Sequence, residues 1–509
     1  MYSRITSVLT LLCCVTLISC HAHNPEANTV VMVIENSPNN LDLRIGTDAQ
    51  AEHIGALIFD SLVRKDEHFQ LQPWLAESWE QPDARTLIFH LRHGVRFHDG
   101  RALTSADVKW TLDSLRNGSI VSAKAANYAS IAAIEAPDDF TVVLHLLYPD
   151  VMLLWNLGNG TLGIVPRGSG SNLGQHPIGS GPFRFVSQMQ DKEVVLERNP
   201  DYWQTPPAIE RLRFAVVPDT TTRALELQKG SADIASNALT PDMIYSMRNQ
   251  KNVVIETHTG TVLNYINFNA TDPILRDKRV RQAIAYAINR PLIIHALWRD
   301  HAQLADTLLP PSHWALAGAG EVASYDYDPA KARSLLDAAG FPVLGNGVRF
   351  HLTMKTSTDE TARLLAEVVQ EQLRTVGIAI DLRSSEFGTF YADITHGSFQ
   401  MYTLRWVGDN ESPAIFRNAY STGGFSPRGY NRGHYSNPQL DALIAAANKE
   451  PDEATRHADY LQIQKIIAED EPTLMLWYLD NIVVHSRRLT NVHLTQMGTF
   501  DFLRSARLQ

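Results

Sequence analysis

Cysteine is almost absent from this sequence. The chain has 509 residues and three cysteines, Cys13, Cys14 and Cys20, which all stand near the N-terminus. The rest of the chain carries no thiol, so it contains neither an internal disulfide bond nor a cysteine for metal binding or catalysis.

An excess of positive charge is missing as well. Lys and Arg together number 45 against 55 Asp and Glu, which gives a formal net charge of -10. Because a surface that attracts nucleic acid needs the opposite balance, nucleic-acid binding is disfavoured. The hydrophobic share of 44% is ordinary for globular protein, and at about 100–200 residues per domain the length predicts two to four domains.

The common catalytic and nucleotide-binding motifs are also lacking. We find no GxSxG, HExxH or GxxxxGK[ST] pattern and no paired-cysteine metal spacing. Gly158, Gly160 and Gly163 satisfy GxGxxG, but the residues that follow open no helix for a pyrophosphate. His90 and His93 would point to opposite faces of a strand and make a poor chelating pair. The sequence therefore predicts no enzyme activity, no metal site and no cofactor.

A short apolar segment stands near the N-terminus. After Arg4, the run Val8 to Ile18 has the proportions of a secretory signal and is too short for a membrane span of about 20 residues. It ends in LISC, Leu17 to Cys20, which resembles the bacterial lipobox. We expect a lipoprotein signal peptide over residues 1–19 and acylation of Cys20, which would anchor the protein to a membrane. An ordinary signal peptide cut nearby is the alternative.

From Asn28 onward, short β-like runs alternate with amphipathic helical patterns, which predicts an α/β fold. Asp328 with Pro329 and Asn437 with Pro438 are typical helix starts, and an apolar stripe predicts a third helix between 359 and 377. The glycine-rich stretch 158–182 predicts a long surface loop. The expected strands are 30–35, 86–91, 141–146, 194–199, 211–217, 253–258, 348–354, 378–384, and runs near 401 and 474.

One segment mixes aromatic and charged residues more than the others. The run 401–413, MYTLRWVGDNESP, is an apolar strand that ends in Arg405, Trp406, Asp409 and Asn410. A carboxylate just beyond a strand end and beside an indole suits an ammonium ligand, through ion pairing and cation–π contact. Asp409 as a turn residue or helix cap is the other interpretation of this pattern.

Longer blocks carry a resemblance to a known family. They are LIFHLRHGVRFHDGRALTSADVKWTL (87–112), HPIGSGPFRF with VVLERNPDYW (176–203), PDTTTRALELQKGSADIA (218–235) and NYINFNATDPILRDKRVRQAIAYAINR (264–290). In content and order they resemble the family 5 extracytoplasmic solute-binding proteins of ABC transporters, which include dipeptide, oligopeptide and nickel binders. We expect these blocks to be structural, since NPDYW has the form of a turn with aromatic packing. FHDGRALTSADV has the form of a hairpin end that leads into a helix capped near Thr104 or Ser105, with Asp107 in its first turn.

The resemblance implies a periplasmic-binding-protein-like fold of type II, in the large peptide-binding variant. It has two lobes with a cleft and two hinge crossings. The implied bounds are 29–263 and 485–509 for lobe one, with an extra subdomain at about 61–207, then 270–475 for lobe two, and crossings at about 262–269 and 475–484.

The resemblance also implies site residues. WVGDNESP looks like the segment whose aspartate holds the α-amino group in dipeptide-binding relatives, which gives Asp409 that role, with Trp406 as an apolar wall and Asn410 beside it. Those relatives place an arginine for the peptide carboxylate where this chain reads MKTSTDET (354–361). Lys355 or Arg405 would face the other end of the ligand, but a lysine lacks the bidentate fork of arginine. The ligand therefore need not be a dipeptide.

The expected function is that of a monomeric, lipid-anchored, extracytoplasmic protein that captures a small peptide or peptide-like solute and delivers it to the permease of an ABC importer. The alternative keeps the fold and changes the solute to a nickel chelate, haem or another organic molecule. An enzyme is disfavoured because no nucleophile and base pair is visible. A fold-related transcriptional regulator is disfavoured because the family blocks begin directly after the leader.

Overall fold

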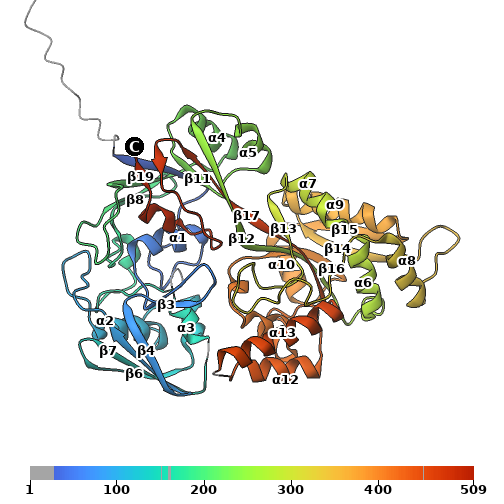
Figure 1. Cartoon of the computed structure of the whole chain (residues 1–509), viewed down its shortest axis with the longest axis horizontal. Coiled ribbons are helices and arrows are strands. Elements are labelled where there is room, and N and C mark those ends of the chain that lie inside the picture. Colours follow the sequence, from blue (N-terminus) through green and yellow to red (C-terminus); the bar gives the residue numbers. More distant parts are fainter. Residues whose placement is uncertain (1–27, 151, 159–161, 451) are drawn as a thin grey trace, which may run out of the picture.

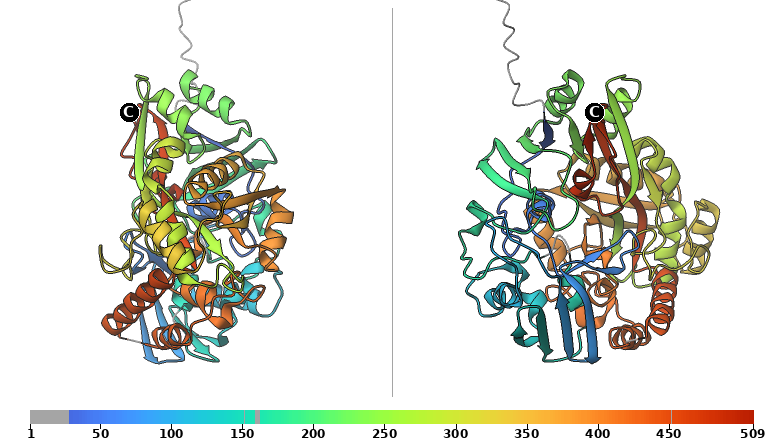
Figure 2. Two further views of the ribbon diagram at one scale, coloured as in Figure 1. Left: turned by 90° about the vertical axis from the view of Figure 1, so that its right-hand side faces the viewer. Right: turned by 60° about the vertical axis from the view of Figure 1, so that its left-hand side comes forward.

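Two lobes lie side by side and are connected through two long strands (Figure 1). The computed structural model describes residues 28–150, 152–158, 162–450 and 452–509. Strands β12 (Val253–Phe268) and β17 (Thr473–Ser486) run antiparallel through both lobes, from the pair Val253 and Ser486 to the pair Asn267 and Thr473. The chain ends in the lobe where it began (Figures 1 and 2). The expected two-lobed α/β fold is confirmed.

A single large sheet continues from one lobe into the other. Its order is β15-β14-β16-β12-β17-β11-β1-β10-β9-β8, and β13 pairs with β17 at the side. Every strand that we expected in this sheet is present. The remaining members are β1 (Thr29–Ile34), β8 (Phe183–Met189), β9 (Glu193–Arg198), β10 (Arg211–Val216), β11 (Ile234–Ser236), β13 (Ala302–Leu304), β14 (Phe350–Ser357), β15 (Ile378–Ser385) and β16 (Met401–Trp406).

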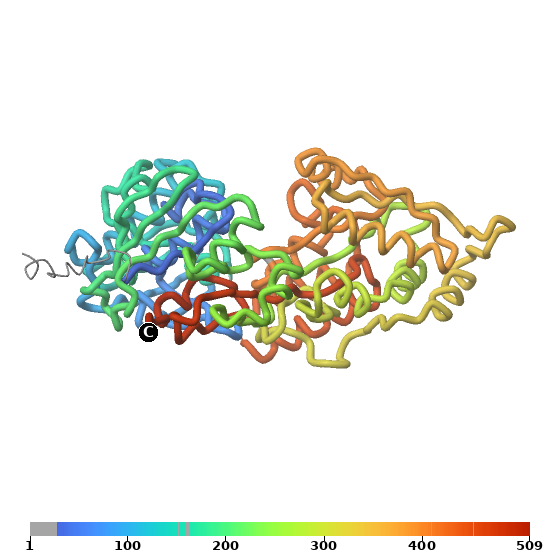
Figure 3. The backbone as a smooth tube through the Cα atoms, turned by 90° about the horizontal axis from the view of Figure 1, so that it is seen from above, coloured from blue at the N-terminus to red at the C-terminus, as the bar shows by residue number. Residues whose placement is uncertain are grey.

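The hydrophobic core divides where the two long strands pass between the lobes. Along β12, Val253 belongs to a first-lobe cluster and Leu263 to a second-lobe cluster; along β17 the change falls between Tyr478 and Ile482. The register of β12 against β17 shifts between Thr259 and Leu263, which is typical of a β-bulge and bends the strand. Seen from above, the two masses are separate on either side of these strands (Figure 3).

The first lobe also contains a separate four-stranded sheet in the order β4-β5-β7-β6. Helix α2 packs on this sheet and begins at a capping box, in which Thr104 and Asp107 satisfy each other's backbone N–H groups. This confirms the helix start expected near Thr104. The bounds are β4 (Ala76–Asp83), β5 (Thr86–Leu91), β6 (Ile131–Asp138), β7 (Thr141–Leu146), α2 (Ser105–Arg116), β2 (Val63–Lys65), β3 (Leu71–Pro73), α1 (Ala49–Ile58), η1 (Ala123–Tyr128), α3 (Leu153–Asn156), η2 (Leu173–Gln175), α4 (Thr220–Lys229), α5 (Pro241–Met247), β18 (Leu489–Thr490), η5 (Phe500–Arg504) and β19 (Arg507–Leu508).

The second lobe is built on parallel strands covered by helices. Strands β14 and β15 are parallel and are joined by α9 (Glu360–Arg374), whose apolar stripe is buried as expected. Asp328 and Asn437 cap α8 and α12, each followed by a proline in the first turn. The other helices are α6 (Lys278–Ala287), α7 (Arg290–Trp298), α8 (Pro329–Ala338), α10 (Phe387–Thr395), η3 (Asp409–Glu411), α11 (Ile415–Tyr420), η4 (Thr422–Gly424), α12 (Pro438–Ala447) and α13 (Glu453–Asp470). Among the described helices, none has the length and apolar character that a membrane crossing requires.

The NPDYW block serves the scaffold. The buried carboxylate of Asp60 accepts hydrogen bonds from the indole nitrogens of Trp74 (2.8 Å) and Trp203 (2.9 Å), from the Ser180 hydroxyl (3.0 Å) and from the Tyr202 hydroxyl (3.3 Å). A buried charge is stable only when its lone pairs are satisfied in this way. Tyr202 and Trp203 therefore hold the first lobe together, as expected for this block.

The described part of the glycine-rich stretch 158–182 is a loop, as expected, but only its middle lies on the surface and both of its ends are buried. Its described residues form no helix or strand apart from η2, but Ile164 and Val165 are fully buried. Gly181 N–H donates to the Ile58 carbonyl over 2.9 Å, and a Cβ atom at Gly179 would lie 2.0 Å from that same oxygen. Here glycine permits close packing of backbone on backbone, which its abundance alone does not distinguish from exposure.

Candidate functional site

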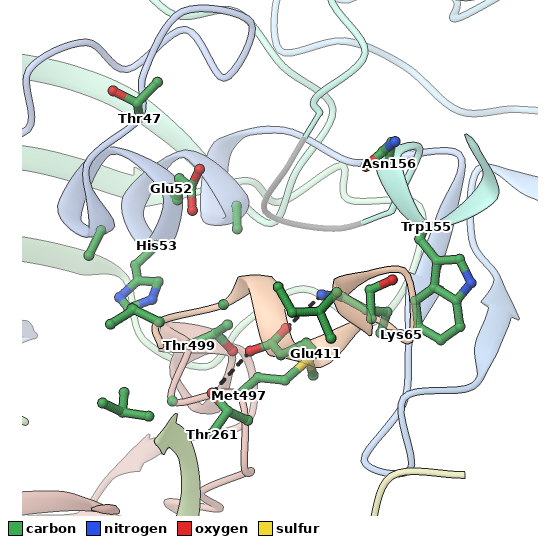
Figure 4. Close-up of a pocket in the computed structure, with 18 of the residues that line it drawn as sticks. Thr47, Glu52, His53, Lys65, Trp155, Asn156, Thr261, Glu411, Met497 and Thr499 are labelled. Carbon is green, nitrogen blue, oxygen red and sulfur yellow. Dashed lines mark hydrogen bonds and ion pairs between the residues drawn. The ribbon is translucent and has the colours of Figure 1, made fainter. Parts of the chain in front are cut away.

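A cavity of about 1210 Å³ lies between the two lobes (Figure 4). The first lobe contributes the end of β1, helix α1, strand β2 and the region of α3; the second contributes the chain from Val407 through α11. The crossing strands form the remaining wall. The polar and charged lining residues are Glu35, Thr47, Gln50, Glu52, His53, Lys65, Lys124, Asn127, Asp150, Asn156, Ser236, Asn237, Thr261, Glu411, Ser412, Arg417, Asn418, Asn448, Asn481 and Thr499.

Residues that directly follow strands of both lobes line this cavity. In the first lobe, Glu35 and Asn237 directly follow the parallel strands β1 and β11. In the second, Val407 and Gly408 follow β16, which runs parallel to β14. Open α/β sheets bind their ligands beyond the carboxyl ends of their strands, because loops there converge and backbone groups are unpaired. The location therefore suits a ligand site.

An ion pair crosses the cavity wall from one lobe to the other. Lys65 Nζ of β2 lies 2.7 Å from Glu411 Oε2 of η3, and the side chains are only 14% and 12% exposed. The Thr261 hydroxyl, on the crossing strand β12, donates to Glu411 Oε1 over 3.1 Å (Figure 4). Glu411 is thus held by the first lobe and by the crossing strand at once, and its position depends on how the lobes are arranged.

Helix α1 presents a second group of titratable residues. Glu52 Oε1 lies 3.0 Å from Lys124 Nζ, and the neighbouring His53 ring packs on Phe500 with centroids 4.8 Å apart. Burial lowers the pKa of His53, and the nearby carboxylates of Asp501, Glu411 and Asp48 oppose that shift in part. A neutral imidazole at the cavity wall can donate and accept one hydrogen bond each.

Arg417 is the exposed cation of the second lobe in this cavity. It stands on α11, and among the described residues no side-chain hydrogen bond or ion pair occupies its guanidinium. Glu35, 53% exposed, keeps only a 3.5 Å contact with Arg223. A free guanidinium with its fork of donors is suited to a carboxylate of the ligand.

Trp406 and Asn410 lie behind the wall of the cavity and are not among the residues that line it. Trp406 is 7% exposed, stacks on Tyr265 with centroids 5.5 Å apart and meets the edge of Tyr430. Asn410 is fully buried, and its side-chain amide donates to the carbonyls of Thr261 (2.9 Å) and Leu308 (3.3 Å). Both residues fix the segment that places Val407 and Gly408 at the cavity. Asp409 begins η3, but its side chain lies outside the described part of the structure, as does Cys20.

Lys355 and Arg405 lie elsewhere in the second lobe. Lys355 Nζ forms an ion pair with Asp393 Oδ2 at 2.7 Å. Arg405 is exposed and lines a smaller pocket of about 270 Å³ beside Asp359 and Trp298. Because successive residues of a strand point to opposite faces, Arg405 and Trp406 cannot face the same side of β16. The structure therefore does not bring the predicted cations to the interlobe cavity.

Lys65, Glu411 and Arg417 line the interlobe cavity, although the sequence did not predict them as site residues. Glu411 stands in the same WVGDNESP segment as Asp409, so its charge could have been weighed with that segment. Lys65 is 346 positions from Glu411, and no local pattern connects them. Over the described ranges, no group of three or more His, Cys, Asp or Glu side chains could hold a metal ion.

Comparison with known proteins identifies the family of this chain. Residues 70–427 match the model of "Bacterial extracellular solute-binding proteins, family 5 Middle". The "Dipeptide-binding protein" of Escherichia coli (strain K12) is 28% identical over 484 residues, covering 89% of this chain and 90% of that protein. The "Glutathione-binding protein GsiB" of Shigella dysenteriae serotype 1 is 28% identical over 489 residues and 94% of each chain.

Solved structures share the architecture. The crystal structure of NikA from Brucella suis in complex with Fe(III)-EDTA superposes with a TM-score of 0.83 at 24% identity, over 94% of this chain and 100% of that one. At this identity the likeness concerns the fold. It covers both lobes, since nearly the whole of each chain is included.

Proposed function

This chain belongs to family 5 of the bacterial extracellular solute-binding proteins and is the binding component of an ABC importer, and we propose that its solute is a peptide or a peptide-like molecule. The observation that carries the proposal is the interlobe cavity, which has carboxylates of the first lobe and the exposed Arg417 of the second on its walls. A peptide carries a charge of each sign at its ends. Similarity to dipeptide-binding and glutathione-binding proteins supports the same class.

The size of the cavity favours a ligand larger than a dipeptide. Its volume of about 1210 Å³ exceeds the ~300–1,000 Å³ that is usual for pockets holding drug-sized molecules. The lining also includes the side-chain amides of Asn127, Asn418 and Asn448, which can pair with the donors and acceptors of a peptide backbone. We infer a short peptide of several residues, or a modified one.

We propose that Asp409 holds the α-ammonium group of the ligand, as its place in WVGDNESP predicts, with Trp406 and Asn410 holding that segment from behind. For the carboxylate end, Lys355 and Arg405 stay predictions from the sequence. The lining of the cavity supports Arg417 in preference to both, because Lys355 is paired with Asp393 and Arg405 belongs to another pocket.

For the lobes we keep the proposed bounds 29–263 with 485–509, including a subdomain at about 61–207, and 270–475, joined by crossings at about 262–269 and 475–484. The register shift before Leu263 and the change of hydrophobic cluster along β12 and β17 support crossings in this part of the chain. Two adjacent crossings suit a hinge, which closes the lobes on a solute if the closed contacts are favourable.

We further propose that the protein acts as a monomer without catalysis and that residues 1–19 are a lipoprotein signal peptide. Acylated Cys20 would then anchor it outside the cytoplasm, since several acyl chains bind a membrane stably where one does not. Metabolic labelling with a fatty-acid analogue should mark the wild type and leave Cys20→Ser unmarked. Equal labelling of both would contradict the anchor.

Native mass spectrometry of protein purified without refolding tests the ligand class. We expect a retained mass that fragments as a peptide and that is lost after unfolding and refolding. A retained nickel chelate, haem or other organic molecule would overturn the peptide proposal. It would favour the second candidate function, the binding of a non-peptide solute. The structural likeness to NikA, which was solved with Fe(III)-EDTA, is the reason to consider this function.

A further inference from the structure

A hairpin of the first lobe carries a buried phenylalanine at its tip. Strands β2 and β3 are joined by the turn 66–70, in which the Asp66 carboxylate accepts from the backbone N–H groups of His68 (2.8 Å) and Gln70 (2.9 Å). Phe69 has φ of 59°, a left-handed conformation that is unfavourable for a bulky residue. Its side chain is nevertheless completely buried. The tip of a two-stranded hairpin cannot bury a phenyl ring by itself, so something else covers it.

The cover comes from the second lobe. The Phe69 ring stacks on the imidazole of His313 with centroids 5.2 Å apart and planes 18° from parallel. Trp314 N–H donates to the His68 carbonyl over 3.2 Å, which joins the same two segments through their backbones. Trp155 of α3, also in the first lobe, stacks on His313 at 6.3 Å. The two lobes thus share an aromatic contact beside the cavity.

His313 is held in place by its own lobe. Its Nδ1 accepts from the Ala315 N–H over 3.0 Å, and Ala315 belongs to the second-lobe hydrophobic cluster. Phe69 belongs to neither the first-lobe cluster around β4–β7 nor the second-lobe cluster around α11–α13. It therefore contributes to neither core and can leave its position without disturbing either.

We propose that Phe69 is an interlobe clasp, a positioning residue that stabilises the closed arrangement of the lobes by inserting between His313 and the rest of its own hairpin. Opening the lobes would expose the ring, so burial of Phe69 favours closure whether or not a solute is present. The apparent affinity for a solute decreases when the fraction of protein in the closed state decreases. Phe69 thus sets affinity without touching the solute.

The proposal requires two lobes that close and does not depend on the solute being a peptide. A simple criterion distinguishes the clasp residue from residues of the binding site. Loss of a site residue changes affinity by a factor that depends on the solute, whereas loss of the clasp changes every affinity by one common factor.

The interlobe distance measures the clasp directly. The mature chain has no cysteine after Cys20, so spin labels can be placed in Cys20→Ser at Val121→Cys in the first lobe and Ala446→Cys in the second, both exposed positions. Without solute, the wild type should give one main distance. Phe69→Ala should add a second, different distance and change the ratio of closed to open protein by ~10-fold or more.

Matched variants test whether the change in distance comes from the loss of the Phe69 ring. Phe69→Leu keeps an apolar side chain and should give an intermediate ratio, while Tyr327→Ala removes an exposed ring of the second lobe and should leave the distribution unchanged. If Phe69→Ala fails to fold, His313→Ala removes the clasp from the opposite side and should open the lobes in the same way. Distance distributions of the clasp variants identical to wild type would overturn the proposal.

Discussion

Two of the contacts that join the lobes beside the cavity differ in kind. The contact of Phe69 with His313 is aromatic and completely buried at Phe69, whereas Lys65 and Glu411 form an ion pair whose side chains keep a small exposure to the cavity. Salt does not screen the burial of apolar surface, but it does screen a charge pair at a cavity wall, which also responds to a charged solute. The difference separates a contact that stabilises closure from one that a ligand can alter.

A change in the proposed site itself should have the largest effect on binding. Removing one member of a buried, hydrogen-bonded charge pair costs ~2–5 kcal/mol, because the partner charge stays desolvated. Asp409→Asn should therefore weaken peptide binding at least ~30-fold, measured by titration calorimetry with a peptide library. Glu450→Gln is the surface control. If Asp409→Asn bound every peptide as tightly as wild type while remaining folded, the amine-anchoring role of Asp409 would be excluded.

Acid should weaken the aromatic contact. Burial, with a smaller effect of the Lys65 charge, lowers the pKa of His313 from 6.5 to about 3. Below pH 6.5 the unfolded or exposed imidazole takes up a proton that the buried one does not, so stability falls between pH 6.5 and 3. The loss amounts to about 2 kcal/mol at pH 5.

Urea unfolding at several pH values measures this loss. Burial also lowers the pKa of His53 and His98, so the comparison must be with His313→Gln, which should show a smaller fall in stability on acidification than wild type. Parallel curves for the two proteins would show that His313 is not the group responsible.

Substitutions in the clasp and in the site should differ in how their effect on affinity depends on the peptide. Phe69→Ala should weaken binding of each peptide in the same library by one common factor, which equals the closed fraction of the wild type divided by that of the variant, because only this fraction changes. The factor for Asp409→Asn should vary with the peptide and vanish for ligands without a free amine. A peptide-dependent factor for Phe69→Ala would assign Phe69 to the binding surface.

The charged contact should have the smallest effect. A double-mutant cycle of Lys65→Met and Glu411→Gln should give a coupling of about 1 kcal/mol, since the pair is partly screened by the cavity. Measured by urea unfolding, this coupling should decrease at high salt, while the effect of Phe69→Ala should not. A salt-independent coupling would mean that the ion pair, too, is shielded from solvent.

Local signals in the sequence predicted most elements correctly. Asp328 with Pro329 and Asn437 with Pro438 mark the starts of α8 and α12, and Thr104 with Asp107 marks that of α2. Each signal lies within one turn of the chain, because caps and first-turn prolines act on neighbouring backbone groups. The family blocks predicted the two-lobed fold for a similar reason, as they contain such turns and caps in a characteristic order.

The glycine-rich stretch shows the limit of local signals. Its composition is the same whether the loop lies on the surface or, as here, against the backbone of Ile58. The site shows the limit again, since Trp406 and Asn410 were expected beside the ligand and instead support the segment that lines the cavity.

By itself, the sequence determined the alternation of strands and helices, the absence of internal thiols and the family to which the chain belongs. These depend on composition and on residues close together along the chain. Only the tertiary structure decided that Lys65 meets Glu411 across 346 positions, that Arg417 lines the cavity, and that Phe69 is covered by His313. Such contacts form where separate lobes approach each other, and the free energy that maintains them comes from burial that no single segment provides.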